Sequence, residues 1–168
     1  MNILIFAAHP DDEVLGVGGT IAKYAAQGDE VFVLMVSGHL PPLYKLEDYE
    51  TTVSEAYSAF DILGVSKSRF LEIPATMIGD QPLNEINDKI SKVVKDFNPH
   101  IVFCPYPDRH VDHRLVFDSV LVATRPVGKG RDIAILAAYE TLSETHWNAP
   151  HIEPNFTPNW VVNISDHV

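Results

Sequence analysis

The segment that decides the fold of this chain is Asn2-Ile3-Leu4-Ile5-Phe6-Ala7-Ala8-His9-Pro10-Asp11-Asp12-Glu13. Its apolar part, residues 2–8, runs without alternation and so predicts a strand buried on both faces of a sheet. A histidine and two adjacent carboxylates follow this strand directly. Because ligands gather at the carboxyl ends of strands in open α/β sheets, we expect a functional site at this point.

Strands and helices alternate along the rest of the chain. Apolar residues recur at helical spacing in several segments, and Gly28 and Gly64 end two of them. We expect helices over 13–27, 49–63, 82–97 and 113–123, and strands over 2–8, 30–37, 70–73, 100–104, 133–139 and 160–164. This order predicts the α/β class, with a mostly parallel sheet covered by helices on both faces.

The composition predicts one soluble domain over residues 1–168. A net charge of −11 argues against a nucleic-acid partner, because such proteins need a basic face. Cys104 is the only cysteine, which excludes an intramolecular disulfide, fits a reducing compartment and favours a packed thiol. With no basic leader and no apolar stretch of bilayer length, we expect a cytoplasmic protein without membrane insertion.

The first chemical group is His9 with Asp11 and Asp12. Adjacent carboxylates repel each other and need a proton or a cation to coexist near neutral pH. A metal ion on Asp12 would resolve the repulsion and leave Asp11 free to act as a base. The plainer alternative is that one aspartate only caps the helix that begins near Glu13.

The second group, residues 108–113, follows the strand expected over 100–104 and therefore falls on the same edge of the sheet. It holds His110 and His113 on either side of Asp112. One histidine can bind a metal while the other faces a reacting carbonyl, and Asp112 can orient a histidine through its other ring nitrogen. The alternative is a solvated charged loop with a helix cap at Asp112.

Together the two groups supply His9, Asp12 and His113 as three ligands, with a fourth position open for water, which is typical of catalytic zinc. Zinc lowers the pKa of a bound water to about 7. Asp11 would take the proton from that water, and His110 would stabilise the oxyanion or protonate a leaving amine. This machinery hydrolyses an amide or an ester, and iron(II) or cobalt would accept the same ligands.

With these motifs the sequence resembles the PIG-L/LmbE family of zinc-dependent N-deacetylases. The resemblance implies a Rossmann-like three-layer α/β/α fold and zinc on His9, Asp12 and His113. It also implies that Asp11 is the general base and that His110, supported by Asp112, is the acid or electrostatic partner. The implied substrates are N-acetylglucosamine conjugates. The residues that carry the resemblance are 8–13, Gly16, Gly18, Gly19 and 110–114, with further matches at 63–65, 139–140 and 158–160.

Three departures from the family pattern affect these expectations. Val111 stands where many members have proline, and Thr52 stands where many have a substrate-facing arginine three residues before Glu55. The chain ends at Val168, where relatives usually continue into a final helix. A metal-loaded module that binds a sugar or nucleotide without turnover, and a zinc hydrolase of another amide or ester, therefore stay open. A homo-oligomer also stays open.

Other residues have plainer interpretations. The glycines of residues 16–19 lack dinucleotide-finger spacing, so we expect them to serve close helix–sheet packing. Trp147 and Tyr139 either stack on a sugar ring or pack internally. Arg109 and Arg114 either hold an anionic group of the substrate or pair with Asp108 or Asp118. Loop histidines without a clear partner are expected to be solvated; they are His39, His146, His151 and His167.

Overall fold

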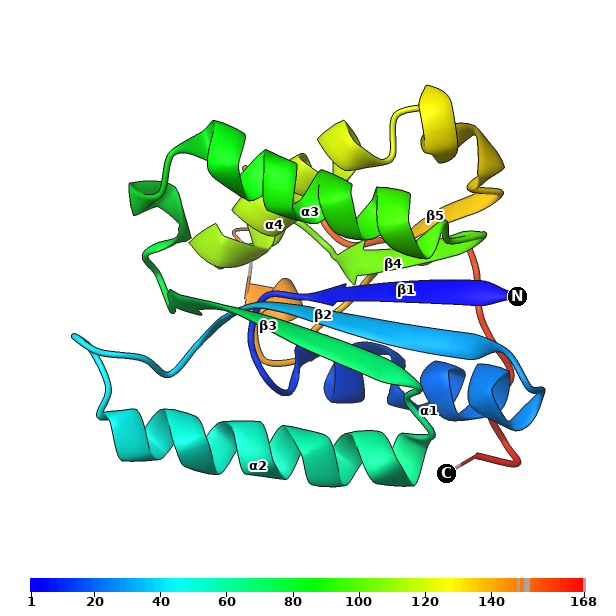
Figure 1. Ribbon diagram of the computed structural model, residues 1–168, viewed down its shortest axis with the longest axis horizontal. Coiled ribbons are helices and arrows are strands. Elements are labelled where there is room, and N and C mark those ends of the chain that lie inside the picture. The colour runs from blue at the N-terminus through cyan, green and yellow to red at the C-terminus, as the bar shows by residue number, and fades with distance from the viewer. Residues whose placement is uncertain (148, 150–151, 168) are drawn as a thin grey trace.

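A computed structural model describes residues 1–147, 149 and 152–167 of the chain (Figure 1). Within these residues, five parallel strands form one sheet in the order β3-β2-β1-β4-β5. The strands are β1 (Asn2–Ala7), β2 (Glu30–Gly38), β3 (Lys67–Pro74), β4 (Ile101–Pro105) and β5 (Ile135–Tyr139). The α-helices are α1 (Asp12–Ala26), α2 (Leu46–Leu63), α3 (Leu83–Phe97) and α4 (Val111–Ala123). Short 3₁₀ helices span Ile78–Asp80, Gly128–Asp132 and Thr145–Trp147.

The sheet is the middle of three layers. Helices α3 and α4 cover one face, and α1 and α2 cover the other (Figure 1). In β1, Leu4 and Phe6 belong to the first apolar core, while Ile3 and Ile5 belong to the second, and all four are fully buried. The predicted α/β fold with a parallel sheet buried on both sides is therefore confirmed.

The order in which strands are added to the sheet changes direction at β1. From β1 the chain passes through β2 to the edge strand β3, and then returns to place β4 on the other side of β1. Ile3 pairs with Ile101 and Ile5 with Phe103, so the two strands end close together. In open α/β sheets such a reversal leaves a crevice at the carboxyl ends, and both predicted chemical groups follow these two strands.

The strand expected over 160–164 is wrong. These residues form no ladder within the described part of the chain. Instead, the Trp160 ring stacks on Phe103 with 5.8 Å between ring centroids. Ile164 lies against Gly19, where an added Cβ would meet its Cδ1 at 2.4 Å. Trp160 and Ile164 thus pack on the sheet and on α1 through their side chains, whereas Val161 is exposed.

Other boundaries shift by a few residues. Helix α1 begins at Asp12 rather than Glu13, α2 begins at Leu46, and β3 begins at Lys67. The prediction of close packing at the first glycine is confirmed, because a Cβ on Gly16 would come within 2.2 Å of the Tyr139 ring. None of the helices in the described residues combines the length and apolar composition that a bilayer crossing requires.

Candidate metal centre

Three histidine rings from distant parts of the sequence meet at the crevice. His9 lies in the loop after β1, whereas His110 and His113 lie at the start of α4. The ring centroids are 4.5 Å apart for His9 and His110, 5.0 Å for His110 and His113, and 5.7 Å for His9 and His113. The structure therefore brings the two predicted groups together.

Asp12 joins this cluster at distances that suit a shared ion. Its Oδ2 lies 3.5 Å from His9 Nδ1 and 3.3 Å from His113 Nε2. Tetrahedral zinc with bonds of about 2.1 Å requires neighbouring ligand atoms about 3.4 Å apart. His113 Nε2 is buried and has no hydrogen-bond partner among the described residues, so its position fits a metal ligand.

An alternative ligand set replaces Asp12 by His110. Ligand atoms of His9, His110 and His113 all lie within 4.8 Å of one another. We favour the set with Asp12, because its two contacts of 3.5 and 3.3 Å match edges of a tetrahedron and because a carboxylate also balances the charge of the cation. This choice leaves the His110 ring free beside the ion position.

Asp108 fixes His113, and the sequence reasoning missed this role. Its Oδ2 lies 2.9 Å from His113 Nδ1 and accepts a hydrogen bond of 2.9 Å from Thr145 Oγ1. Its Oδ1 accepts from the His110 backbone N–H at 2.9 Å, and the residue is fully buried. A carboxylate on one ring nitrogen directs the other nitrogen toward a metal. A buried acid five residues before His113 was the available signal.

Asp112 orients a histidine as predicted, but the ring is that of His9. Its Oδ2 lies 2.9 Å from His9 Nε2 and accepts a hydrogen bond from the Thr76 backbone N–H at 2.6 Å. The resemblance implied support of His110 instead. The contact to His110 comes from the backbone, because the Asp112 N–H donates to His110 Nδ1 at 3.2 Å. That bond assigns the ring proton of neutral His110 to Nε2.

Asp11 adopts an unusual backbone conformation with φ 137° and ψ −28°. Such a conformation costs a non-glycine residue about 1–3 kcal/mol and is found mainly at functional sites. Asp11 precedes α1 without a side-chain capping bond, so the simple helix-cap alternative does not account for it. Partial burial and the charge of Asp12 raise the pKa of Asp11 above its usual value, which makes it a better proton acceptor near neutral pH.

The charges around the histidines favour a cation. Burial alone would lower the pKa of His9, but Asp112 and Asp12 outweigh it and raise that pKa to about 9. Burial alone would also lower the pKa of His113. The contacts with Asp108 and Asp12 outweigh this effect and raise that pKa to about 10. The carboxylates thus stabilise positive charge where Asp12 and the ring nitrogens meet, which is what a divalent ion supplies.

The remaining candidate residues divide between the cavity and the packing around it. A cavity of about 190 Å³ lies over the histidines, and His39 lines it rather than pointing into solvent alone. The Tyr139 hydroxyl donates to the Phe6 carbonyl at 2.7 Å, so this ring is part of the core. His146 contacts Glu140 at 2.6 Å, and His151 lies outside the described residues.

The two arginines form ion pairs with glutamates. Arg114 pairs with Glu153 at 2.7 Å rather than with Asp118, and its Nε donates to the backbone carbonyl of Asp108. Arg109 lies 5.6 Å from the centre of the Trp147 ring. Arg114 thus links the start of α4 to Glu153, and the Nε of Arg109 lies 3.7 Å from Oε2 of Glu144, which lines the cavity.

Comparison with known proteins identifies the family of the chain. The PIG-L family, described as GlcNAc-PI de-N-acetylase, matches residues 4–124. Diacetylchitobiose deacetylase of Thermococcus kodakarensis is 31% identical, with 98% of this chain and 64% of that protein covered. A 1D-myo-inositol 2-acetamido-2-deoxy-alpha-D-glucopyranoside deacetylase of Rhodococcus opacus is 29% identical, covering 77% of this chain and 55% of that protein. The chain thus spans less than two thirds of the length of these relatives.

Solved structures share the fold. The conserved protein TT1542 of Thermus thermophilus superposes with a TM-score of 0.76 at 27% identity, covering 98% of this chain and 72% of that one. N,N'-diacetylchitobiose deacetylase of Pyrococcus horikoshii superposes with a TM-score of 0.73 at 25% identity, covering 98% of this chain and 64% of that one. Since the family match spans well over half of the sequence and includes both chemical groups, the chain belongs to the PIG-L family.

Proposed function

We propose that this chain is a metal-dependent hydrolase that removes the acetyl group from an N-acetylglucosamine-type sugar or conjugate. The observation that carries the proposal is the meeting of His9, Asp12 and His113 at ligand spacing, with Asp11 and His110 beside them. The deacetylases among the relatives support the same reaction class. The proposal treats residues 1–168 as one deacetylase domain.

His9, Asp12 and His113 would hold zinc or another divalent ion such as iron(II). Such an ion supplies a Lewis acid that polarises the acetamide carbonyl and lowers the pKa of water. Asp112 and Asp108 hold the two ligand histidines in orientation through their second ring nitrogens.

Asp11 and His110 provide the proton transfers. Asp11 accepts a proton from the water whose oxygen adds to the acetyl carbon. Because His110 Nδ1 accepts from the Asp112 N–H, its Nε2–H is the donor that faces the reacting group. It stabilises the developing oxyanion and supports protonation of the nitrogen as the C–N bond breaks. The products are acetate and a free amine.

The cavity over the histidines offers polar groups for a sugar. Tyr44, Ser143 and Glu144 line it together with His39. Hydroxyl and carboxylate groups of this kind position the hydroxyls of a saccharide, while the acetamide is directed at the histidine cluster.

Two alternative functions make different predictions. A metal-loaded module that binds a sugar or nucleotide would not need Asp11 or His110. A zinc hydrolase of another amide or ester would use the same residues with a different pocket. A cytoplasmic location and a homo-oligomer remain predictions from the sequence.

The test combines metal analysis with detection of released amine by fluorescamine. Zinc-loaded protein is offered N-acetylglucosamine, diacetylchitobiose and N-acetylglucosaminyl inositol. We expect amine release from at least one of them, loss of release in Asp11→Asn with retained zinc, and no change in the exposed control Asp61→Asn. Sugar binding without amine release from any substrate would favour the binding module, and full activity of Asp11→Asn would refute the assigned base.

A further inference from the structure

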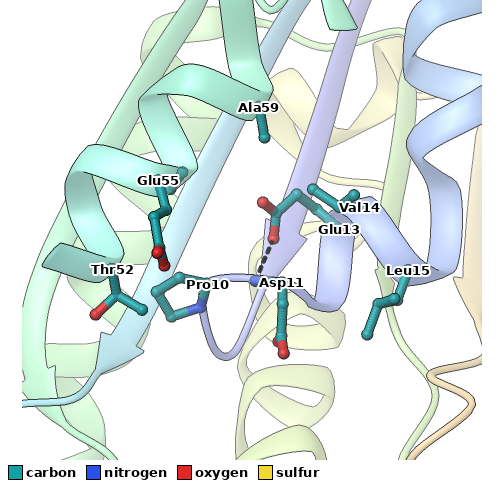
Figure 2. Close-up of a pocket in the computed structure, with 9 residues that line it drawn as sticks. Pro10, Asp11, Glu13, Val14, Leu15, Thr52, Glu55 and Ala59 are labelled. Atoms are coloured by element: carbon teal, nitrogen blue, oxygen red, sulfur yellow. Dashed lines mark hydrogen bonds between the residues drawn. The ribbon is translucent and has the colours of Figure 1, made fainter. Parts of the chain in front are cut away.

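A second cavity, of about 200 Å³, lies between the first turn of α1 and the middle of α2 (Figure 2). Pro10 and Asp11 line both this cavity and the one over the histidines. We call it the acidic recess, and define it by Pro10, Asp11, Glu13, Val14, Thr52 and Glu55. Pro10 and Asp11 therefore form a shared wall between the two cavities.

Glu13 is a buried acid with an unused oxygen. It is fully buried, and its Oε2 accepts from the Asp11 backbone N–H at 3.3 Å. Its Oε1 has no hydrogen-bond partner among the described residues. A buried carboxylate oxygen without a partner is costly, so this atom indicates a donor that the described chain does not supply.

Glu55 adds a second carboxylate from the opposite wall. Figure 2 shows Glu13 reaching in from α1 and Glu55 from α2, whereas the Asp11 carboxylate points away from Glu13. None of the lining residues is basic. The Thr52 hydroxyl is bonded to the Asp48 carbonyl of its own helix at 2.5 Å and does not reach Glu13. The lining thus holds carboxyl groups and supplies no cation of its own.

The rest of the lining is apolar and comes mainly from Val14, Leu15, Ala56 and Ala59. Among the described residues, the group whose ligand atoms lie close enough to share a metal ion is His9, His110 and His113. It includes no carboxylate of the recess. The recess therefore suits a carbon-bearing cation better than a bare metal ion, because the stem can pack on the apolar wall while the head meets the acids.

We propose that the acidic recess binds an ammonium or guanidinium group carried by the N-acetylated substrate. The substrate would place its acetamide at the metal centre and its cationic substituent between Glu13 and Glu55. This inference rests on the proposed function, because it assigns the recess to the same substrate. It defines the substrate class as an N-acetylated sugar or conjugate that also carries a positive charge.

A binding experiment tests the recess without requiring turnover. Zinc-loaded protein is titrated with butylammonium chloride and, separately, with 1-butanol at equal ionic strength, and backbone amide shifts are followed by NMR. We expect butylammonium to bind about tenfold more tightly than butanol, with shifts around Thr52 and Glu13. Glu55 is exposed, so Glu55→Gln should weaken ammonium binding about two- to fivefold, and the equally exposed control Glu50→Gln on the same helix should not.

Thr52→Arg supplies a cation from the protein itself. We expect its guanidinium to occupy the recess and abolish butylammonium binding. In turnover assays the wild type should prefer a chitobiose with one acetamide and one free amine over diacetylchitobiose by about tenfold, and Thr52→Arg should lose this preference.

The outcomes test cation binding in the recess separately from the proposed deacetylation. Equal binding of butylammonium and butanol, or ammonium binding that Glu55→Gln leaves unchanged, overturns the inference even if deacetylation is observed. Selective ammonium binding without any amine release supports the recess and counts against the proposed function.

Discussion

Asp108 offers the sharpest test of how the metal centre is built. The change Asp108→Asn keeps the size of the side chain and replaces one acceptor oxygen by a donor. The two oxygens serve different partners, since Oδ2 contacts His113 Nδ1 and Oδ1 accepts from the His110 N–H, each at 2.9 Å. An asparagine can satisfy only one of them as an acceptor.

Both orientations of the asparagine have a cost. With its NH₂ toward His113, the ring must move its proton to Nε2 and lose that atom as a ligand. With its NH₂ toward His110, two donors meet at the start of α4. Loss of such a supporting contact weakens metal binding about 10–100-fold. This range equals about 1.4–2.7 kcal/mol, close to the value of one charge-assisted hydrogen bond.

The assay is competition for zinc between the protein and a chromophoric chelator. Asp108→Asn is compared with the wild type and with Asp118→Asn, an exposed aspartate on the same helix. Circular dichroism checks that the variants are folded. The reasoning is refuted if folded Asp108→Asn binds zinc within a factor of about three of the wild type.

Three further outcomes follow from packing, burial and metal binding. Gly16→Ala should lose about 1–3 kcal/mol of unfolding free energy in urea, because its Cβ would lie 2.2 Å from the Tyr139 ring. Gly18→Ala is the matched control, since the atom nearest to its Cβ would be Val14 Cγ1 at 3.8 Å, and an equal loss there would contradict the packing argument. Burial raises the pKa of Cys104 to about 12, so Ellman's reagent should react only after unfolding in guanidinium, and rapid reaction of native protein would count against this. Removal of zinc should lower the unfolding free energy by about 2.7 kcal/mol relative to protein in zinc at a hundred times its Kd, and calorimetry that finds no change would exclude tight binding to the folded state.

The sequence predicts the position of the site well because the strands that carry it are strongly patterned. Leu4 and Phe6 face one core while Ile3 and Ile5 face the other, so β1 reads as a continuous apolar run. Such runs identify buried parallel strands, and the polar residues that follow them must then lie at one edge of the sheet. This reasoning from strand pattern alone places His9 near His113.

The partners of the histidines could not be predicted in the same way. Asp108 and Asp112 both lie near His113 in sequence, and only the turn that starts α4 decides that Asp108 contacts this ring while Asp112 contacts His9. The failed strand over 160–164 has a similar cause. Trp160 packs on Phe103 through its ring face, and an apolar run cannot show whether it will pair by backbone or pack by side chain.

The carboxylate of Asp112 joins His9, which follows β1, to the Thr76 backbone, which follows β3, and itself stands on α4. Asp112 Oδ2 therefore holds together three segments that are distant in the sequence. A chain that ends before α4 carries His9 and Thr76 but lacks Asp112 and His113, so the proposed ligand set is complete only when both halves of the sheet are assembled.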